Sequence, residues 1–431
     1  MGGVFAEGEI AMERAAITMV ILGAGDRGRT YAAYAAAYPK QVKVVGVADI
    51  NPAARAAVAQ AHGLGPEAQW GDWSEAVAAK PKCDVMVIAM PDALHVEPAI
   101  ACLDAGYHLL LEKPMARSWA ECEKLAAKVR EVQPRLVILG HVLRYTVYFK
   151  KLHDLLQGGA IGEVVSIQHL EPVAYMHAAH SFCRGNWGNT ERATPMILQK
   201  CCHDFDQFVW WLGGKRCTGV SSFGSTFHFN AAHKPAGAAE RCLDCPAAVE
   251  RACPYSARKI YLERQDYRYP FVDKRDEAME AMLREGPYGR CVYACDNDAV
   301  DHQVVNLRFE GGITVAHQME SYTYTGGRET KVFGTRGEIV GNGRTLTIYH
   351  FDTRTTEVWD SVLEAGMPMG SGHGGGDFGL MDELVRQLTA ADPAGWGEIF
   401  EVSLESHRIA FAAEESRRQQ GALKLAERSE R

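Results

Sequence analysis

Residues 17–28 read ITMVILGAGDRG, and this stretch is the strongest indication of the fold. Its apolar first half is typical of a buried strand, and the G-x-G-x-x-G loop that follows precedes a helical pattern. The glycines permit a tight turn, a close approach of backbone to a pyrophosphate, and close packing of helix on strand. The N-terminus of the helix would supply oriented N–H groups and partial positive charge. We expect a dinucleotide to be bound by Gly23, Gly25, Asp26, Arg27 and Gly28.

Asp49 indicates which dinucleotide is bound. It ends the next predicted strand, 21 positions after Gly28. A carboxylate there can accept hydrogen bonds from both ribose hydroxyls and would repel a 2′-phosphate. The sequence therefore predicts NAD as the cofactor in preference to NADP. A glycine-rich turn without a nucleotide is the alternative, but the order of strand, loop, helix and acid argues against it.

Short apolar runs alternate with helical patterns through the first 140 residues. Strands are expected at 17–22, 42–47, 84–89, 107–111 and 136–139. Such alternation is typical of βαβ units and of a parallel sheet covered on both faces. Ser118 and Glu121 form a capping-box pattern at the start of a helix. The fold class is therefore α/β, with an N-terminal extension at 1–16 and a doubly wound Rossmann domain at 17–140.

Residues 141–431 are predicted to form a second α/β domain. A helix is expected at 147–156, and strand-like segments recur at 164–169, 219–223, 303–309, 314–319, 331–333 and 345–350. Strands rich in Val, Thr and aromatic residues, joined by Gly-containing turns, predict an open and mainly antiparallel sheet. Helical patterns at 378–388 and 398–419 close the chain, and a Cys-rich insertion occupies about 228–300.

Composition and charge exclude several classes of protein. The 46 basic and 54 acidic residues give a net charge of −8, which does not favour binding to nucleic acid. No apolar stretch reaches the roughly 20 residues of a membrane span, and the acidic start lacks the features of a secretory signal. Twelve cysteines in such a chain favour reduced thiols over disulfides. We expect a cytoplasmic protein that acts on neither nucleic acid nor membranes.

The cysteines of the insertion suggest a metal site. Cys242 and Cys245 form a C-x₂-C pair, Cys253 precedes a proline, and Cys291 and Cys295 follow. Such spacing is typical of tetrahedral thiolate coordination of zinc. The predicted ligands of a structural zinc ion are Cys242, Cys245, Cys253 and one of Cys291 or Cys295. An iron–sulfur cluster and unliganded thiols are the alternatives.

Several motifs together resemble the Gfo/Idh/MocA family, which includes glucose–fructose oxidoreductase and inositol dehydrogenase. They are the Gly-rich loop, AMPDALH at 89–95, EKP at 112–114, GAIGE at 159–163, CHD at 202–204 and GTRGE at 334–338. The resemblance implies a Rossmann domain followed by an α/β domain whose open sheet forms a homo-dimer or homo-tetramer. It also implies that the cofactor is contacted by Pro91, His95, Glu112 and Lys113.

The same resemblance implies two catalytic residues. Lys113 would lie between nicotinamide and substrate, with a cis peptide before Pro114, where its ammonium would favour the alkoxide-like form of the reacting hydroxyl. His203 would act as the general acid/base, because an imidazole titrates near neutrality. The family commonly places an Asp four residues before this His, but here that position is Gln199, followed by Lys200. Whether a carboxylate pairs with His203 is therefore left open.

Further residues are predicted to contact a carbohydrate substrate. Polar arms and an aromatic platform would suit a sugar, and His373 lies in a segment, 371–377, that resembles the His-Gly-Gly loop of NAD-dependent glycosidases. The predicted contacts are Arg144, Tyr145, Arg184, Trp187, Lys200 and His373.

Three functions remain open from the sequence. The first is an NAD-dependent oxidoreductase that acts on a hydroxyl of a sugar, polyol or glycoside. The second is a glycosidase that oxidises its substrate transiently, eliminates the aglycone and then returns the hydride. The third is a sensor of NAD or sugar without catalytic activity, against which Lys113 and His203 argue.

Overall fold

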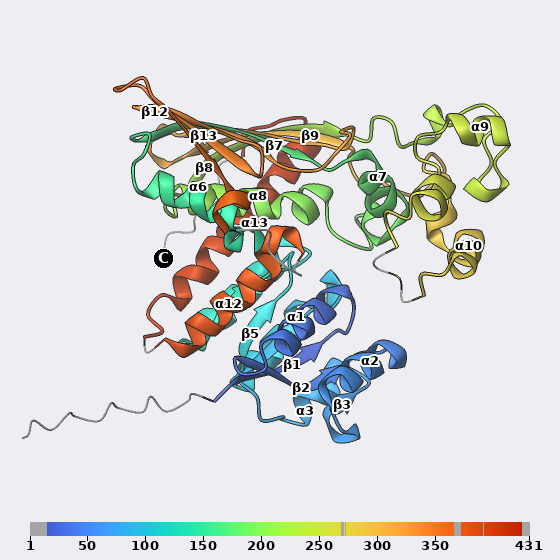
Figure 1. Ribbon diagram of the computed structural model, residues 1–431, viewed down its shortest axis with the longest axis horizontal. Coiled ribbons are helices and arrows are strands. Elements are labelled where there is room, and N and C mark those ends of the chain that lie inside the picture. The colour runs from blue at the N-terminus through green and yellow to red at the C-terminus, as the bar shows by residue number, and fades with distance from the viewer. Residues whose placement is uncertain (1–14, 269–270, 272, 366–371, 391, 425–431) are drawn as a thin grey trace, which may run out of the picture.

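The computed structural model describes residues 15–268, 271, 273–365, 372–390 and 392–424, and it contains two sheets (Figure 1). A six-stranded sheet is formed by the first part of the chain and an eight-stranded sheet by the second. Helices lie between the two sheets. These two sheets confirm the predicted α/β fold class, whereas the expected N-terminal extension lies almost entirely outside the described residues.

The first sheet is parallel throughout and has the strand order β3-β2-β1-β4-β5-β6. Its central strands are apolar because both faces are covered: all four residues of β4 (Val85–Ile88) are buried. The strand order reverses between β1 and β4, and in a doubly wound fold the ligand binds at this crevice, beside the carboxyl ends of the strands. The glycine-rich loop follows β1 directly.

The predicted strands of this domain are confirmed, and β3 is a short strand that the sequence did not indicate. The capping box at Ser118 and Glu121 is also confirmed. The bounds are β1 (Ile17–Leu22), α1 (Asp26–Ala37), β2 (Val42–Ala48), α2 (Pro52–His62), β3 (Gln69–Trp70), α3 (Trp73–Ala78), β4 (Val85–Ile88), α4 (Val96–Asp104), β5 (His108–Leu111), α5 (Trp119–Glu131) and β6 (Val137–Leu139).

The second sheet has the order β14-β13-β12-β11-β7-β10-β9-β8, and all of its pairs are antiparallel except β7 with β10. Buried and exposed residues alternate strictly along β9, so one face is covered and the other is open. Figure 1 shows α6, α8 and α13 on the covered face. The sheet therefore confirms the predicted open, mainly antiparallel architecture.

The prediction missed two strands of this sheet, β12 and β14. Glycines at both ends of β12 and an exposed edge position for β14 leave little of the apolar alternation that identifies a strand. The bounds are α6 (Val147–Gln157), β7 (Val164–Pro172), α7 (Tyr175–His177), α8 (Met196–Trp211), β8 (Cys217–Ser225), α9 (Ala247–Ala252), α10 (Asp276–Glu285), β9 (His302–Phe309), β10 (Thr314–Glu320), β11 (Glu329–Gly334), β12 (Gly337–Gly341), β13 (Thr345–His350), β14 (Thr356–Asp360), α11 (Ser361–Ala365), α12 (Gly376–Thr389) and α13 (Trp396–Arg418).

The segment between β8 and β9 forms a separate lobe beyond one end of the second sheet, and it carries α9 and α10 (Figure 1). The last two helices return to the first domain, where α12 packs beside α1 and α13 contacts α5 and β6. Segments from both ends of the sequence therefore meet around the carboxyl ends of the Rossmann strands. None of the described helices is long and apolar enough to cross a membrane.

Candidate active site

Lys113 lies directly after β5, at the edge of the Rossmann sheet that faces the second domain. Its Nζ donates to the carbonyl oxygen of Gln199 at 3.0 Å and lies 5.7 Å from the ring centroid of Trp187. The peptide between Lys113 and Pro114 is cis, as the resemblance implied. Lys113 thus brings the first domain into contact with α8 and with the segment that precedes it.

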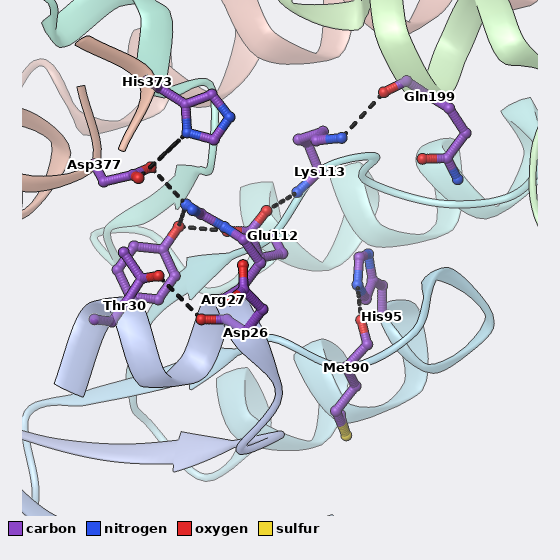
Figure 2. Close-up of polar contacts among 11 residues, drawn as sticks. Asp26, Arg27, Thr30, Met90, His95, Glu112, Lys113, Gln199, His373 and Asp377 are labelled. Carbon is purple, nitrogen blue, oxygen red and sulfur yellow. Dashed lines mark hydrogen bonds and ion pairs between the residues drawn. The ribbon is translucent and has the colours of Figure 1, made fainter. Parts of the chain in front are cut away.

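Two buried histidines hold the loop around Lys113. The Nδ1 of His95 lies 2.6 Å from the carbonyl oxygen of Pro114, and its Nε2 lies 2.9 Å from that of Met90 (Figure 2). His407 of α13 accepts a hydrogen bond at Nε2 from the backbone N–H of Met115, at 2.8 Å. Both nitrogens of His95 therefore lie against backbone carbonyl oxygens of this loop, and its contact with the cofactor stays a prediction.

His203 is buried in α8 within electrostatic range of Lys113. Its Nδ1 is buried and has no hydrogen-bond partner among the described residues. The ring centroids of His141 and His373 lie 5.8 Å and 6.5 Å from that of His203. Burial, reinforced by Lys113 and His141, lowers the pKa of His203 well below its ordinary value. The imidazole is therefore uncharged near neutral pH and able to accept a proton.

The carboxylates closest in sequence to His203 are engaged with other partners. Asp204 pairs with Arg328 and with His169. Asp206 accepts two hydrogen bonds from Arg144, and one of its oxygens lies 2.7 Å from Nδ1 of His141. Although burial alone would raise it, the pKa of Asp206 is held at about 2 by Arg144 and His141. No described carboxylate pairs with His203, which answers the question that Gln199 left open.

Gln199 itself joins two parts of the site. Its backbone carbonyl accepts the hydrogen bond from Lys113, and its side-chain amide donates to Asp92, in the turn after β4. This turn begins with Pro91, one of the residues predicted at the cofactor. A glutamine can make this contact where an aspartate would be repelled by Asp92.

A chain of charged groups runs from the glycine-rich loop to His373 (Figure 2). Arg27 donates to Glu112 at 2.6 Å and lies 2.9 Å from Asp377, which in turn lies 3.1 Å from Nδ1 of His373. Burial would raise the pKa of Glu112, but Arg27 and the Tyr31 hydroxyl lower it overall. The side chains of Arg27 and Glu112 therefore contact each other, and their contact with the cofactor stays a prediction.

The geometry of the glycine-rich loop fits a dinucleotide. Gly23 has a φ of +100°, and a Cβ at Gly28 would lie 1.9 Å from the carbonyl oxygen of Gly23. A Cβ at Gly25 would meet nothing within 4 Å, so space remains in front of the loop. No side chain caps the start of α1, which leaves its first N–H groups available for a pyrophosphate. Asp26 contributes the first residue of this helix, and its side chain is exposed.

Asp49 stands at the end of β2, beside this loop. Its carboxylate accepts hydrogen bonds from the backbone N–H groups of Ala24 at 2.6 Å and of Asn51 at 2.7 Å. These bonds hold the carboxylate beside the glycine-rich loop, and its contact with a ribose stays a prediction. The neighbouring Ile50 is 84% exposed, an unusual environment for an isoleucine next to a predicted ribose contact.

The predicted substrate contacts fall into two groups. Trp187 and His373 are partly exposed and lie near Lys113 and His203, and Lys200 on α8 lies 3.2 Å from the buried Glu171. The side chains of Arg144 and Tyr145 instead contact other residues of the protein. Arg144 donates a hydrogen bond to Asp206, and Tyr145 packs against the apolar core of the first domain.

Arg184 is also placed differently from its prediction. It is 1% exposed, and it donates to the backbone carbonyls of Arg290 and Tyr255 and to the thiol of Cys242. The guanidinium is therefore directed into the Cys-rich lobe and not toward Lys113, because the chain turns at Gly185 between Arg184 and Trp187.

Several residues of the site were not found from the sequence. His141, His177, Asp377 and His407 come from four distant segments, and only folding brings them near Lys113 and His203. Burial, then Lys200, His180 and Lys113, lower the pKa of His177 well below its ordinary value. Asp377 lies four residues after His373 at the start of α12, and that spacing was the one signal available in the sequence.

The chain was compared with known proteins. Residues 17–141 match an oxidoreductase family, Gfo/Idh/MocA, over its NAD-binding Rossmann fold, and residues 153–365 match the C-terminal alpha/beta domain of the same family. The putative oxidoreductase YteT of Bacillus subtilis is 23% identical over 324 residues, which cover 70% of this chain and 72% of that protein. Inositol 2-dehydrogenase 1 of Saccharopolyspora erythraea is 30% identical over 134 residues, covering 31% of this chain and 36% of that protein.

The fold was also compared with solved structures. The WlbA dehydrogenase of Chromobacterium violaceum, in complex with NADH and UDP-GlcNAcA, has a TM-score of 0.64 and 14% sequence identity. The match covers 98% of this chain and 99% of that one. At this identity the likeness concerns the fold alone, and it extends over both domains.

Proposed function

Because this chain belongs to the Gfo/Idh/MocA family of NAD-binding oxidoreductases, we propose that it transfers a hydride between NAD and a hydroxyl-bearing carbon of a sugar, polyol or glycoside. The observation that carries the proposal is that Lys113 lies within electrostatic range of a buried, uncharged His203 whose Nδ1 has no hydrogen-bond partner among the described residues. A proton acceptor and an ammonium beside a dinucleotide fold are what alcohol oxidation requires.

NAD would be held by backbone more than by side chains. The N–H groups at the start of α1 would bind the pyrophosphate, Asp49 the ribose, and Ile50 would cover an apolar face of the adenine. When bound, the nicotinamide supplies the hydride acceptor. The open space at Gly25 supports this fit.

The protein residues would divide the remaining chemistry. The Lys113 ammonium donates a hydrogen bond to the reacting hydroxyl and stabilises the negative charge that develops on its oxygen. His203 accepts the hydroxyl proton while the hydride leaves the same carbon, so that the alcohol loses one hydride and one proton to become a carbonyl. The indole of Trp187, 39% exposed and close to Lys113, offers an apolar platform for the C–H face of a sugar ring.

The proposed substrate class rests on two kinds of support. Relatives include proteins named inositol 2-dehydrogenase and a dehydrogenase bound to a UDP-linked sugar acid. In this chain, Trp187 lies 5.7 Å from the Lys113 ammonium, and the ring of His373, 6.5 Å from that of His203, offers hydrogen bonds to hydroxyl groups. These features favour a polyhydroxylated substrate over an apolar one.

A second candidate function is a glycosidase that works by transient oxidation. The observation in its favour is the His373–Asp377 pair, which offers a further acid/base group 6.5 Å from the ring of His203. Oxidation to a ketone would acidify the neighbouring C–H, and a second base could then remove that proton as the aglycone leaves. Water would then add to the enone that elimination leaves, and the hydride would return to its ketone carbon, so that the glycoside is hydrolysed and NAD is unchanged overall.

One assay distinguishes these functions. Purified protein is mixed with NAD and a panel of free sugars, polyols and chromogenic glycosides, and NADH absorbance and aglycone release are recorded on the same samples. NADH that accumulates in step with substrate supports the dehydrogenase. Aglycone release that needs NAD but yields no net NADH supports the glycosidase. Lys113→Met should abolish either activity, whereas Lys124→Met, an exposed control on α5, should leave it unchanged.

We also propose that the chain forms a homo-oligomer through the open face of the second sheet. Phe223 and Val304 are exposed and lie opposite each other on this face, and Val358 is exposed on β14. Apolar side chains on an otherwise uncovered sheet are typical of an interface between subunits. Light scattering on the purified protein tests this, and a monomer would contradict it.

A further inference from the structure

We propose that the lobe between β8 and β9 binds a single zinc ion through the thiolates of Cys242, Cys245, Cys253 and Cys291. All four side chains line one small cavity, although Cys291 is separated from the others by α10 and its flanking loops. The remaining lining includes Pro235, Ala238, Ala239 and Val249 and is largely apolar. Four convergent thiols in an apolar shell are typical of a structural zinc site.

The backbone brings the two halves of this site together. Arg241 and Arg290 form an antiparallel bridge, and the N–H of Cys291 donates to the carbonyl oxygen of Glu240 at 2.9 Å. In this antiparallel pairing Cys291 lies opposite Glu240, so Cys242 and Cys291 lie diagonally across the bridge, and the thiol of Cys242 is 3.8 Å from the carbonyl oxygen of Arg290. Cys245 lies one turn after Cys242, with its N–H 3.4 Å from the carbonyl oxygen of Cys242. The local fold therefore sets the spacing of the ligands without a disulfide.

The structure also distinguishes the two cysteines between which the sequence could not choose. Cys291 lines the cavity, whereas Cys295 does not, and the thiol of Cys295 lies 3.2 Å from the carbonyl oxygen of Cys291. Cys295 therefore remains outside the proposed ligand set and provides a matched control.

Arg184 supplies an independent argument for an anionic group in this lobe. Its guanidinium is buried beside Cys242, and its Nη1 has no hydrogen-bond partner among the described residues. No described carboxylate forms an ion pair with it, so the positive charge is offset only by two carbonyls and a thiol. A buried charge without a counter-ion is costly. Zinc bound by four thiolates carries a net negative charge and would provide that counter-ion.

The cavity that the four thiols line is small. Its volume is about 20 Å³, which is close to the space of a single water molecule. In the described residues, the one group of three candidate ligand atoms within 4.8 Å of one another is Cys201, Asp204 and His317, so the four thiols surround the cavity at wider spacing and would rotate inward on binding.

That other group is a poorer metal site. Asp204 already pairs with the buried guanidinium of Arg328, which also lies 3.0 Å from Glu171. A dication would have to displace or face this arginine, and the repulsion between them would oppose binding. In the lobe, by contrast, the thiols are free and no described carboxylate pairs with the buried Arg184. We therefore assign the metal site to the lobe.

The proposed zinc site is connected to the candidate active site through a short stretch of chain. Arg184 contacts Cys242 and the backbone of Tyr255 and Arg290, and three residues later Trp187 lies over Lys113. The next residues are also fixed to the lobe, since the carbonyl oxygen of Gly188 accepts a hydrogen bond from the N–H of Asp298 at 2.9 Å. Zinc would therefore order the segment that carries Trp187.

The first test is the metal content of purified protein, measured by inductively coupled plasma mass spectrometry. We expect about one zinc per chain in the wild type, in keeping with a four-thiolate site. Cys245→Ser should lose most of this zinc, whereas Cys295→Ser should retain it. Equal zinc in the two variants, or wild-type protein without zinc after expression in zinc-supplemented medium, would overturn the proposal.

The second test uses the wild-type chain, so that it does not depend on how the variants fold. Thiol alkylation of the native protein is followed by mass spectrometry, with and without a strong chelator. The chelator should expose Cys242, Cys245, Cys253 and Cys291 to alkylation and leave the buried Cys102 and Cys122 unchanged. Alkylation of the four thiols at equal rates in both samples contradicts the proposal. Iron with acid-labile sulfide and visible absorbance in the anaerobically purified protein would replace zinc by a cluster and overturn the single-ion assignment.

Discussion

The glycine-rich loop after β1 and the Cys-rich lobe after β8 are candidate ligand sites that are built in opposite ways. The loop uses backbone geometry: Gly23 turns the chain, Gly28 lets α1 pack against it, and the apolar strands beneath are buried on both faces. The lobe has only short helices, and its cysteines converge through one bridge and the contacts of Arg184. A ligand site built on a packed sheet is fixed before the ligand arrives, whereas a site built on side chains depends on what binds there.

The largest expected effect on activity is that of a substitution at His203, in α8. His203→Asn keeps a polar side chain of similar size in α8 but removes the proton acceptor, so we expect kcat to fall by about 10²–10⁴-fold. The affinity for NAD, measured by fluorescence titration, should change little, because neither the loop nor the lobe is altered. Gln207→Leu, a substitution at a buried position one turn further along α8, is the control for disturbance of the helix. Retention of full turnover in His203→Asn would remove His203 from the chemistry.

A pair of glycine substitutions tests whether the loop is set by backbone geometry. In Gly28→Ala the new Cβ would lie 1.9 Å from the carbonyl oxygen of Gly23, so the loop must shift, at a cost of about 1–3 kcal/mol in the free energy of unfolding. In Gly25→Ala the new Cβ meets nothing, so folding should be preserved while NAD affinity falls, because this Cβ occupies the space in front of the loop. Denaturant unfolding and NAD titration separate the two effects. Equal stability of both variants would contradict this account of Gly28.

Acid should lower the stability of the fold through buried histidines, one of which lies beside the lobe. Burial lowers the pKa of His180, beside the lobe, to about 4, and those of His317 and His407 to about 3, from an ordinary value of 6.5. Between pH 6.5 and about 4 the unfolded chain therefore binds protons that the folded chain does not, so the free energy of unfolding falls as pH decreases. Each such histidine contributes a slope of up to about 1.4 kcal/mol per pH unit. Denaturant unfolding at a series of pH values measures this slope.

A substitution at His180 measures how much the lobe contributes to the dependence of the free energy of unfolding on pH. His180→Phe removes the titrating group that lies against Tyr261, Tyr267 and Tyr288 and should reduce the slope, whereas His153→Phe, at a histidine on α6 that is not buried, should leave it unchanged. A pH-independent stability across this window would show that the buried histidines do not remain uncharged.

The contrast between the two regions also explains how much the sequence could predict. The Rossmann strands, the glycine-rich loop and Asp49 follow from local periodicity and spacing, because each part of that site is adjacent to a strand end. The Gfo/Idh/MocA resemblance placed Lys113 and His203, but it could not show that Arg27 and Glu112 pair with each other or that Asp206 is used by Arg144. Such partners are decided by packing between distant segments. Arg184 and Trp187 illustrate this, since neighbours in sequence face different sites.

The smallest expected effect concerns Trp187, where the lobe meets the chemistry. If the indole only contacts the Lys113 ammonium, as the 5.7 Å separation suggests, its removal costs about 0.5–1 kcal/mol, or a few-fold in kcat/KM. If it is also the platform for substrate, Trp187→Leu should raise KM more than it lowers kcat, because a platform contributes to binding in both the ground state and the transition state. Removal of zinc from the wild type should then produce the same change in KM, since the metal would order the segment that carries this residue. If KM rises in Trp187→Leu but does not change when zinc is removed from the wild type, the lobe does not influence substrate binding, and the two regions act independently.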